Sequence, residues 1–317
     1  MEVKSDVPLP FRMKDSSRLV QETVEGPDGI QFNTITVEPA TTGKEQRPPC
    51  RGKVLFVHGW CEHVGMYYRI METLADQGFE CHAFDQRGSG KTSLGKYRGR
   101  VGRTKEVIYH DLDSMIEHFF FNSSSEEGEK KDSHILVGHS MGGGIALNYA
   151  VHGKYRNELT HVITTGPLVS VHASVLPSPW FVYLLGTVAS WFPNMTYSTC
   201  NGPTTTTSSP YWKEYLGTEL LCQGLGTLGQ LSNMLSRGHD LLHGDISTIN
   251  PNVKLLVLHA EHDNYTCIKA SEQFVNRVDL KHKEFHKVEG ACHSLFIESD
   301  PIYNKVSEKI NVFLADV

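Results

Sequence analysis

No stretch of the 317-residue sequence stays apolar for the roughly 20 residues that a membrane-spanning helix requires. Residues 1–19 carry charged side chains at short intervals and contain no apolar block, so we expect no signal peptide. Both observations argue against an integral membrane protein and against a secreted one. The composition, 39% hydrophobic and 21% charged, is instead typical of a globular protein with a sizeable core.

The few cysteines and the absence of excess positive charge also argue against several classes of protein. The seven cysteines stand singly and form no C-x-x-C pair, which disfavours a disulfide framework and a zinc site. Free thiols fit a reducing compartment, so we expect a cytoplasmic protein. The formal net charge is −6, which gives no basic face for nucleic acid. We therefore predict no metal, no cofactor and no nucleic-acid partner.

Short apolar runs alternate with segments of helical spacing along most of the chain. This alternation predicts an α/β fold with a mostly parallel, eight-stranded sheet that helices flank on both faces. The expected strands cover residues 20–24, 30–37, 53–57, 79–84, 135–137, 160–165, 254–259 and 284–288. The expected helices cover residues 67–77, 105–120, 142–147, 267–278 and 301–314.

Residues 167–250 interrupt the alternation, because they contain several prolines and helix-like pieces but no clear strand. We predict an inserted helical cap here, which divides the chain into a first core part (1–166), the cap (167–250) and a second core part (251–317). Within the cap, residues 180–192 are apolar nearly all round. Two interpretations stay open for this segment: a helix in a membrane interface, or a cap helix buried on the core.

The most informative motif is the G-x-S-x-G sequence Gly138-His139-Ser140-Met141-Gly142. An apolar run precedes it and a small-residue run follows it, as in a strand, a sharp turn and a helix with the serine at the apex. A serine hydroxyl alone is a poor nucleophile, but at such an elbow a histidine can reach it. The motif also occurs by chance, so the interpretation depends on partners elsewhere in the chain.

A nucleophilic serine needs a base, an acid that orients the base, and donors for an oxyanion. Asp263 follows the expected strand 254–259, and His293 follows the expected strand 284–288. Both residues come after Ser140 and after a strand, as this fold requires of the acid and the base. We therefore predict a catalytic triad of Ser140, Asp263 and His293.

Other side chains compete for the same roles. The alternative acids are Glu261, beside Asp263, and two aspartates of the predicted cap, Asp240 and Asp245. The alternative bases are His262, His282 and His286. His282 precedes the last expected strand and His286 lies within it, so among these only His293 comes just after that strand.

Two backbone amides are the predicted oxyanion donors. His58-Gly59-Trp60 ends the strand that contains Val57, and in this type of site an N–H from that loop pairs with the N–H after the nucleophile. These groups are the amides of Trp60 and Met141. Each such donor is worth about 3 kcal/mol of transition-state stabilisation.

One glycine-rich segment imitates a phosphate-binding loop. Gly88-Ser89-Gly90-Lys91-Thr92 follows an expected strand, but the P-loop motif requires glycine where Asp85 stands. No clean helix start follows, because Gly95 and Gly99 interrupt the pattern. We therefore expect no nucleotide site here.

Taken together, the motifs resemble those of a fungal-type monoacylglycerol lipase, a serine hydrolase of the α/β-hydrolase fold. The resemblance covers residues 32–314 and rests on five segments: residues 58–63, 84–90, 138–144, 234–238 and 291–294. It implies hydrolysis of a monoacylglycerol to glycerol and a fatty acid through an acyl-serine, under a cap with an apolar acyl tunnel. It also implies peripheral association with membranes or lipid droplets. We name Trp180, Leu184 and Leu185 as candidate substrate contacts in the cap.

The chain also departs from the family pattern. Trp60 is bulkier than the small residue or phenylalanine often found there, so we expect its side chain to narrow the pocket. Residues 180–192 and the threonine run 204–207 are particular to this cap, which leaves the substrate open. The alternatives are a general carboxylesterase, a lysophospholipase, an acyltransferase with the same acyl-serine, and an inactive hydrolase fold that binds a ligand. The sequence does not indicate the oligomeric state.

Overall fold

The computed structural model describes residues 8–15, 18–39, 50–102, 104–122, 133–174, 179–198, 203–222 and 224–317. The expected absence of a signal peptide concerns a segment whose first residues lie outside these ranges. The same holds for most of the expected loops at 39–52 and 122–133.

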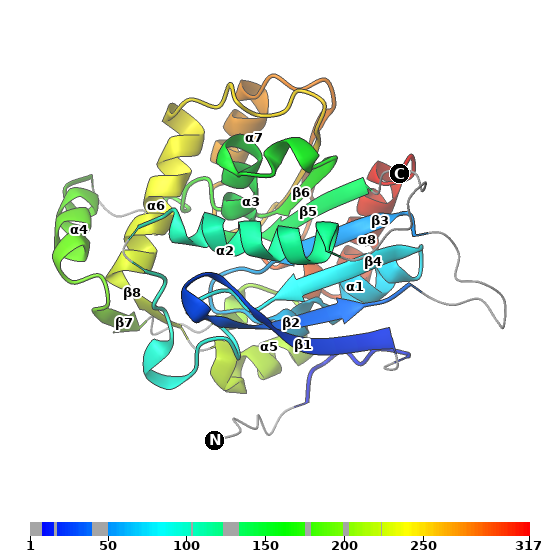
Figure 1. Cartoon of the computed structure of the whole chain (residues 1–317), viewed down its shortest axis with the longest axis horizontal. Coiled ribbons are helices and arrows are strands. Elements are labelled where there is room, and N and C mark those ends of the chain that lie inside the picture. The colour runs from blue at the N-terminus through cyan, green and yellow to red at the C-terminus, as the bar shows by residue number, and fades with distance from the viewer. Residues whose placement is uncertain are drawn as a thin grey trace.

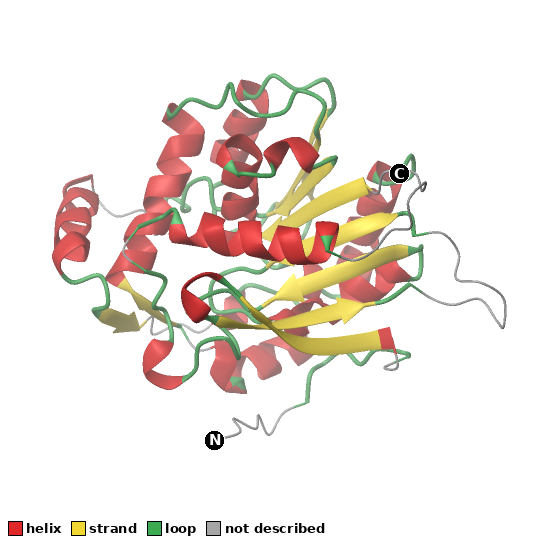
Figure 2. Cartoon of the chain, viewed as in Figure 1, coloured by secondary structure: helices red, strands yellow, loops and turns green. Residues whose placement is uncertain are grey.

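An eight-stranded sheet crosses the middle of the molecule, with helices on both sides (Figures 1 and 2). The strand order is β1-β2-β4-β3-β5-β6-β9-β10; β2 pairs antiparallel with both neighbours, and the other neighbours from β4 to β10 pair parallel. This arrangement confirms the predicted fold class. The strands are β1 (Leu19–Glu25), β2 (Gln31–Val37), β3 (Gly52–Val57), β4 (Phe79–Phe84), β5 (Ser133–His139), β6 (His161–Thr165), β9 (Lys254–Ala260) and β10 (Lys283–Val288).

The central strands are apolar throughout because both faces of the sheet are covered. In β3, Val54 and Phe56 belong to one apolar cluster, whereas Leu55 and Val57 belong to the other. Successive side chains of a strand point to opposite faces, so one continuous apolar run serves two cores. The short run 53–57 therefore carries a clear signal of a buried parallel strand.

Two layers of helices complete these cores. Side chains of α1 (Tyr68–Ala75) and α8 (Asp300–Phe313) pack on one face of the sheet. Side chains of α2 (Val107–Ile116), α3 (Met141–His152) and α7 (Ile268–Arg277) pack on the other. α2 ends earlier than expected, because residues Glu117–Phe121 form a π-helical turn.

The predicted cap segment, residues 167–250, connects β6 to β9. It contains α4 (Pro179–Trp191), α5 (Pro210–Thr218) and α6 (Leu228–His243). The expectation of no strand in this segment was wrong, since β7 (Thr196–Ser198) pairs antiparallel with β8 (Leu225–Thr227). Three residues are too few to show an alternating pattern, so no periodicity indicates these two strands.

α6 joins the cap segment to the core, because it packs against both α3 and α4. α4 lies at the outer edge of the molecule, at the left of Figure 1. No helix in the described ranges has both the length and the apolar character needed to cross a bilayer. The carboxyl ends of β5, β9 and β10 carry the segments that contain Ser140, Asp263 and His293.

Candidate active site

Ser140 stands at a strained turn between β5 and α3. Its backbone has φ 53° and ψ −116°, a conformation that non-glycine residues seldom adopt. The surrounding backbone holds it there: the Ser140 amide donates to the Thr165 carbonyl at 2.9 Å, and the Ser140 carbonyl accepts from the Gly144 amide at 3.0 Å. The turn lifts the hydroxyl clear of the backbone, as the G-x-S-x-G motif predicts.

The motif's glycines are required by close approach of strand and helix. A Cβ on Gly142 would lie 2.0 Å from the Val57 carbonyl oxygen. A Cβ on Gly138 would lie 2.3 Å from the Gly142 carbonyl oxygen. Both neighbours are backbone atoms of buried elements, so neither position has room for a side chain.

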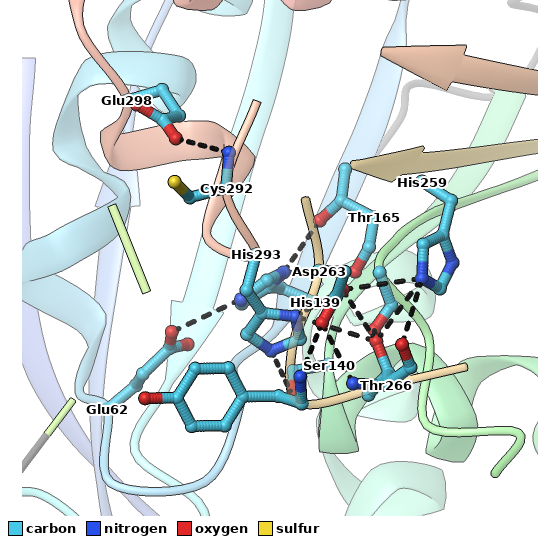
Figure 3. Close-up of polar contacts among 12 residues, drawn as sticks. Glu62, His139, Ser140, Thr165, His259, Asp263, Thr266, Cys292, His293 and Glu298 are labelled. Atoms are coloured by element: carbon cyan, nitrogen blue, oxygen red, sulfur yellow. Dashed lines mark hydrogen bonds and ion pairs between the residues drawn. The ribbon is translucent and has the colours of Figure 1, made fainter. Parts of the chain in front are cut away.

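The structure brings the three predicted triad residues together (Figure 3). His293 Nε2 lies 2.8 Å from Ser140 Oγ, and His293 Nδ1 lies 2.6 Å from Asp263 Oδ2. With the ring proton on Nδ1, His293 donates to Asp263 and accepts from the serine hydroxyl. This hydrogen-bond chain can remove the hydroxyl proton as Ser140 attacks a carbonyl carbon.

Asp263 is held in place by more than the histidine. Its Oδ1 accepts from the backbone amides of Tyr265 and Thr266, both at 2.8 Å, and its Oδ2 accepts from the Thr266 hydroxyl at 2.7 Å. His259 Nε2 lies 3.3 Å from the same Oδ2. Burial opposes the charged form, but the adjacent His293 and His259 rings hold the pKa of the carboxyl well below its usual range. Asp263 therefore stays ionised beside His293.

The proton affinity of His293 is set by opposing effects. Burial lowers its pKa, whereas the charge and hydrogen bond of Asp263, helped by Glu62, raise it. The net result is a pKa above the ordinary value of histidine. His293 is thus a stronger base than a histidine in water, which suits a group that accepts a proton from a hydroxyl.

The competing acids and bases lie elsewhere. Glu261 pairs with Lys287 at 2.8 Å, and Asp240 pairs with Lys105. The remaining competitors are exposed at the surface: Asp245, His262, His282 and His286. In the described part of the chain, the hydrogen bonds and ion pairs of these side chains do not reach Ser140 or His293.

The predicted oxyanion donors lie beside the serine. A Cβ on Gly59 would lie 3.1 Å from Ser140 Cβ, so the turn that carries Trp60 passes against the nucleophile. Within the described ranges, the amides of Trp60 and Met141 donate to no other protein atom. Two free N–H groups next to the nucleophile are the arrangement that an oxyanion needs.

Two buried polar residues under this turn were not predicted. Glu62 Oε2 accepts from the Gly59 amide at 2.7 Å and from the Tyr67 hydroxyl at 2.6 Å. Its other oxygen lies 3.4 Å from Nε2 of His139, the residue before the serine. Burial lowers the pKa of His139 to about 4, so this ring is neutral. Glu62 belongs to the segment 58–63 that carries the family resemblance, but no pattern in the sequence predicts that its carboxylate binds the Gly59 amide and the Tyr67 hydroxyl.

The predicted substrate contacts divide between two sides of α4. Trp180 is 75% exposed and Leu184 is 47% exposed, whereas Leu185 is only 5% exposed. The Trp60 indole turns toward the cap segment, where its Nε1 donates to Gln230 Oε1 at 3.1 Å.

The glycine-rich segment at 88–92 surrounds a carboxylate. Asp85 Oδ2 accepts from the Lys91 amide at 2.8 Å, and a Cβ on Gly90 would lie 2.1 Å from Asp85 Cγ. The loop amide that would face a phosphate in a P-loop is thus engaged by an acid of the chain itself. In the described part of the chain, no three His, Cys, Asp or Glu side chains form a group that could hold a metal ion.

Known proteins match this chain over most of its length. A family model described as serine aminopeptidase, S33 (Hydrolase_4) matches residues 48–300. The monoglyceride lipase of Saccharomyces cerevisiae is 30% identical over 313 residues, which cover 97% of this chain and 96% of that protein. A putative monoglyceride lipase of Schizosaccharomyces pombe is 30% identical over 275 residues, which cover 86% of this chain and 69% of that protein.

A solved structure agrees with these matches. A soluble variant of the Saccharomyces cerevisiae monoglyceride lipase, in complex with a substrate analog, is 27% identical in sequence. The match covers 98% of this chain and 98% of that one, with a TM-score of 0.85. The likeness therefore extends through the sheet, its helices and the segment between β6 and β9.

Proposed function

The chain belongs to the serine aminopeptidase S33 (Hydrolase_4) family of serine hydrolases, and on that premise we propose that it hydrolyses monoacylglycerol to glycerol and a fatty acid. The hydrogen-bond chain Ser140–His293–Asp263 is the observation that carries the proposal. Relatives named monoglyceride lipase, matched over most of this chain, support the choice of substrate.

In the proposed first half-reaction, Ser140 Oγ attacks the ester carbonyl carbon while its proton moves to His293 Nε2. The carbonyl oxygen becomes an oxyanion, which accepts from the amides of Trp60 and Met141. Asp263 stabilises the imidazolium that forms. The ester bond then breaks, the glycerol oxygen takes the proton from Nε2, and the acyl group stays on Ser140.

The second half-reaction repeats these steps with water. Water gives a proton to His293 Nε2 and attacks the acyl carbon, and a second oxyanion forms at the same two amides. The bond to Ser140 Oγ breaks, Oγ recovers the proton, and the fatty acid leaves. No group outside the triad, the two amides and water is required.

We infer an ester substrate for this site rather than the free amino terminus of a peptide. An aminopeptidase holds the charged amine with an acid, and Glu62 is a buried acid beside the triad. Its carboxylate already accepts from the Gly59 amide and the Tyr67 hydroxyl. This engagement supports the lipase activity over the activity in the family's name.

The outer side of the cap segment supports contact with a lipid surface. Trp180, Leu184 and Trp191 are 75%, 47% and 78% exposed and share one side of α4. Phe192 and Met195, which follow the helix, are 63% and 57% exposed. We call these five residues the outer cap surface. Exposed tryptophans among apolar side chains are typical of a membrane interface. We therefore propose that the protein binds peripherally, from the cytoplasm, to the surface of a membrane or lipid droplet.

The opposite side of α4 supports a role in holding the acyl chain. Leu185 and Ala189 are each 5% exposed and lie one helical turn apart, facing inward where α4 packs against α6. We propose that Leu185 contacts the acyl chain in an apolar tunnel. Trp180 and Leu184, given their exposure, would contact lipid at the surface instead.

A substrate panel tests the proposed function. Purified protein and Ser140→Ala are each given a long-chain monoacylglycerol, a lysophospholipid, a short soluble ester and an amino-acid nitroanilide, with and without an alcohol acceptor. We expect the highest kcat/KM on monoacylglycerol, release of free fatty acid, and no turnover by Ser140→Ala. A preference for the short ester, the lysophospholipid or the nitroanilide, or dominant transfer to the alcohol, would overturn the assignment.

The lipid surface has its own test. The double variant Trp180→Ser/Trp191→Ser is floated with phosphatidylcholine vesicles, beside Val312→Ser, which removes an apolar residue 64% exposed on α8. Because a buried apolar side chain contributes about 1.5–3 kcal/mol, we expect at least a tenfold loss of vesicle binding in the double variant only. Equal binding by the wild type, the double variant and Val312→Ser would exclude the outer cap surface as the contact.

A further inference from the structure

The side chain of Trp60 links the oxyanion turn, which we define as residues 59–62, to the cap segment. Its indole N–H donates to Gln230 Oε1 on α6 at 3.1 Å. Its ring stacks on Tyr197 of β7, with centroids 5.8 Å apart and planes 21° from parallel. One residue of the core thus makes a polar and an aromatic contact with two different elements of the cap segment.

The fit around the indole leaves little freedom. A Cβ on Gly226 of β8 would lie 3.2 Å from Trp60 Cζ2 and 3.0 Å from the Tyr197 ring. The backbone of β8 therefore lies against both rings, and the pair β7–β8 holds the indole on one side. The expectation that Trp60 narrows the pocket stays a prediction, and this contact with the cap segment is a separate feature of the side chain.

The rest of the turn is held from beneath. The Glu62 carboxylate accepts from the Gly59 amide at 2.7 Å, which ties the first residue of the turn to the last. Cys61 has φ 59°, a left-handed conformation that strains a residue with a side chain. A strained turn persists only when its surroundings fix it. Here the Glu62 carboxylate holds the turn within the core, and the contacts of the Trp60 side chain with Gln230 and Tyr197 hold it against the cap segment.

We propose that the cap segment, by holding the indole of Trp60, sets the position of the backbone N–H of Trp60. Gln230 and Tyr197 are then positioning residues for this oxyanion donor. The inference rests on the proposed function, because it concerns the transition state of the ester reaction. An oxyanion donor works only when it lies 2.7–3.1 Å from the developing charge. Loss of the anchor lets the turn relax and moves the donor away.

This role differs from that of a pocket wall. The oxyanion exists only in the transition state and the intermediates, so a misplaced donor lowers kcat and leaves KM unchanged. A pocket wall contacts the bound substrate, so its loss raises KM for long acyl chains. A short soluble ester, which does not fill the cap, separates the two roles.

The test uses two variants that break the hydrogen bond between Trp60 and Gln230. Trp60→Phe keeps an aromatic ring and the backbone N–H but lacks the indole N–H. Gln230→Met keeps the length of the side chain but lacks the oxygen that accepts from the indole. Loss of a whole oxyanion donor costs about 10²–10³ in kcat, so we expect roughly a tenfold loss from displacement. KM for the short ester stays unchanged. A short trifluoromethyl ketone forms an adduct with serine that carries an oxyanion. We expect its affinity for each variant to fall by the same factor as kcat.

Asp240→Asn is the matched control, because it removes a different link between α6 and the core, the ion pair with Lys105. We expect it to keep kcat and ketone affinity. The double variant Trp60→Phe/Gln230→Met should be no slower than the worse single variant, because both break one contact.

Three results would overturn the positioning role: raised KM with unchanged kcat, a lower melting temperature alone, or an equal kcat loss in Asp240→Asn. Hydrolysis that survives in Ser140→Ala is a separate outcome. It would overturn the proposed function, and the positioning role with it.

Discussion

His293 is buried between a carboxylate and a hydroxyl, so its protonation state controls the pH at which the site can act. The ring must be neutral to accept the proton of Ser140, and Asp263 raises the pKa of His293 above the ordinary value. We expect kcat/KM to rise with pH through one ionisation whose midpoint lies above about 6.5 and then to level off. A pH–rate profile on a neutral short ester measures this midpoint.

Asp263→Asn tests the cause of that midpoint. The amide removes the charge that favours imidazolium, so the rising limb moves to lower pH. The plateau falls on the order of 10⁴-fold, because asparagine no longer favours the productive tautomer. If the rising limb of the pH–rate profile had the same midpoint in the wild type and in Asp263→Asn, Asp263 would not set the base strength of His293.

The sequence placed Ser140, Asp263 and His293 because each follows a strand, and strand ends can be located from apolar runs. Their proximity could be anticipated, whereas their catalytic roles stay a prediction. Glu62 and Thr266 could not be anticipated in the same way. Their contacts depend on how turns fold back on themselves, and no spacing rule encodes that.

The close approach of α3 to the end of β3 yields a prediction about a single glycine. Gly142→Ala places a Cβ 2.0 Å from the Val57 carbonyl oxygen, so strand and helix must separate. We expect a loss of about 1–3 kcal/mol in unfolding free energy and a large loss of esterase activity. Urea unfolding and an activity assay measure the two effects.

Gly186→Ala is the control for that change. Gly186 lies within α4, and a Cβ there meets no atom within 4 Å. Alanine in a helix interior is favoured over glycine by about 0.5–1 kcal/mol, so this variant should be neutral or stabilised. Similar losses in both variants would mean that the close approach at the elbow is not the cause.

The regular elements were predictable to within a few residues, because buried parallel strands and amphipathic helices leave strong patterns. β7 and β8 left none, since three residues do not define a period. Of the two interpretations of residues 180–192, packing inside the protein holds for one side of the helix, and contact of the other side with a membrane stays a prediction. Trp180 and Trp191 are exposed, while Leu185 and Ala189 are buried, so α4 presents one apolar side to α6 and the other outward. An all-apolar segment cannot reveal which side packs.

Two buried histidines predict how the whole molecule responds to acid. Burial lowers the pKa of His139 and of His161 to about 4 each, below the ordinary histidine value of about 6.5. The unfolded chain therefore binds protons at a higher pH than the folded one. Stability is fully present above pH 6.5 and is lost as pH falls toward 4, by about 3 kcal/mol for each histidine.

Urea unfolding between pH 7 and pH 4 checks this expectation. His161 belongs to neither the triad nor the turn that carries Trp60, so His161→Gln tests its share and should flatten the slope below pH 6.5. His262→Gln, which removes an exposed histidine, should leave the slope unchanged. An identical slope in wild type and His161→Gln would contradict the assignment.

The molecule as a whole is a sheet with two apolar cores, a strained serine at its carboxyl edge and a cap segment joined to the oxyanion turn. Ser140 is the proposed nucleophile for monoacylglycerol hydrolysis. One experiment decides it: the protein is labelled with a fluorophosphonate, the modified residue is mapped by mass spectrometry, and monoacylglycerol hydrolysis is followed in the same sample. We predict one label per chain, on Ser140, with hydrolysis lost in proportion. An unmodified Ser140, or full hydrolysis by the labelled protein, would contradict this role of Ser140.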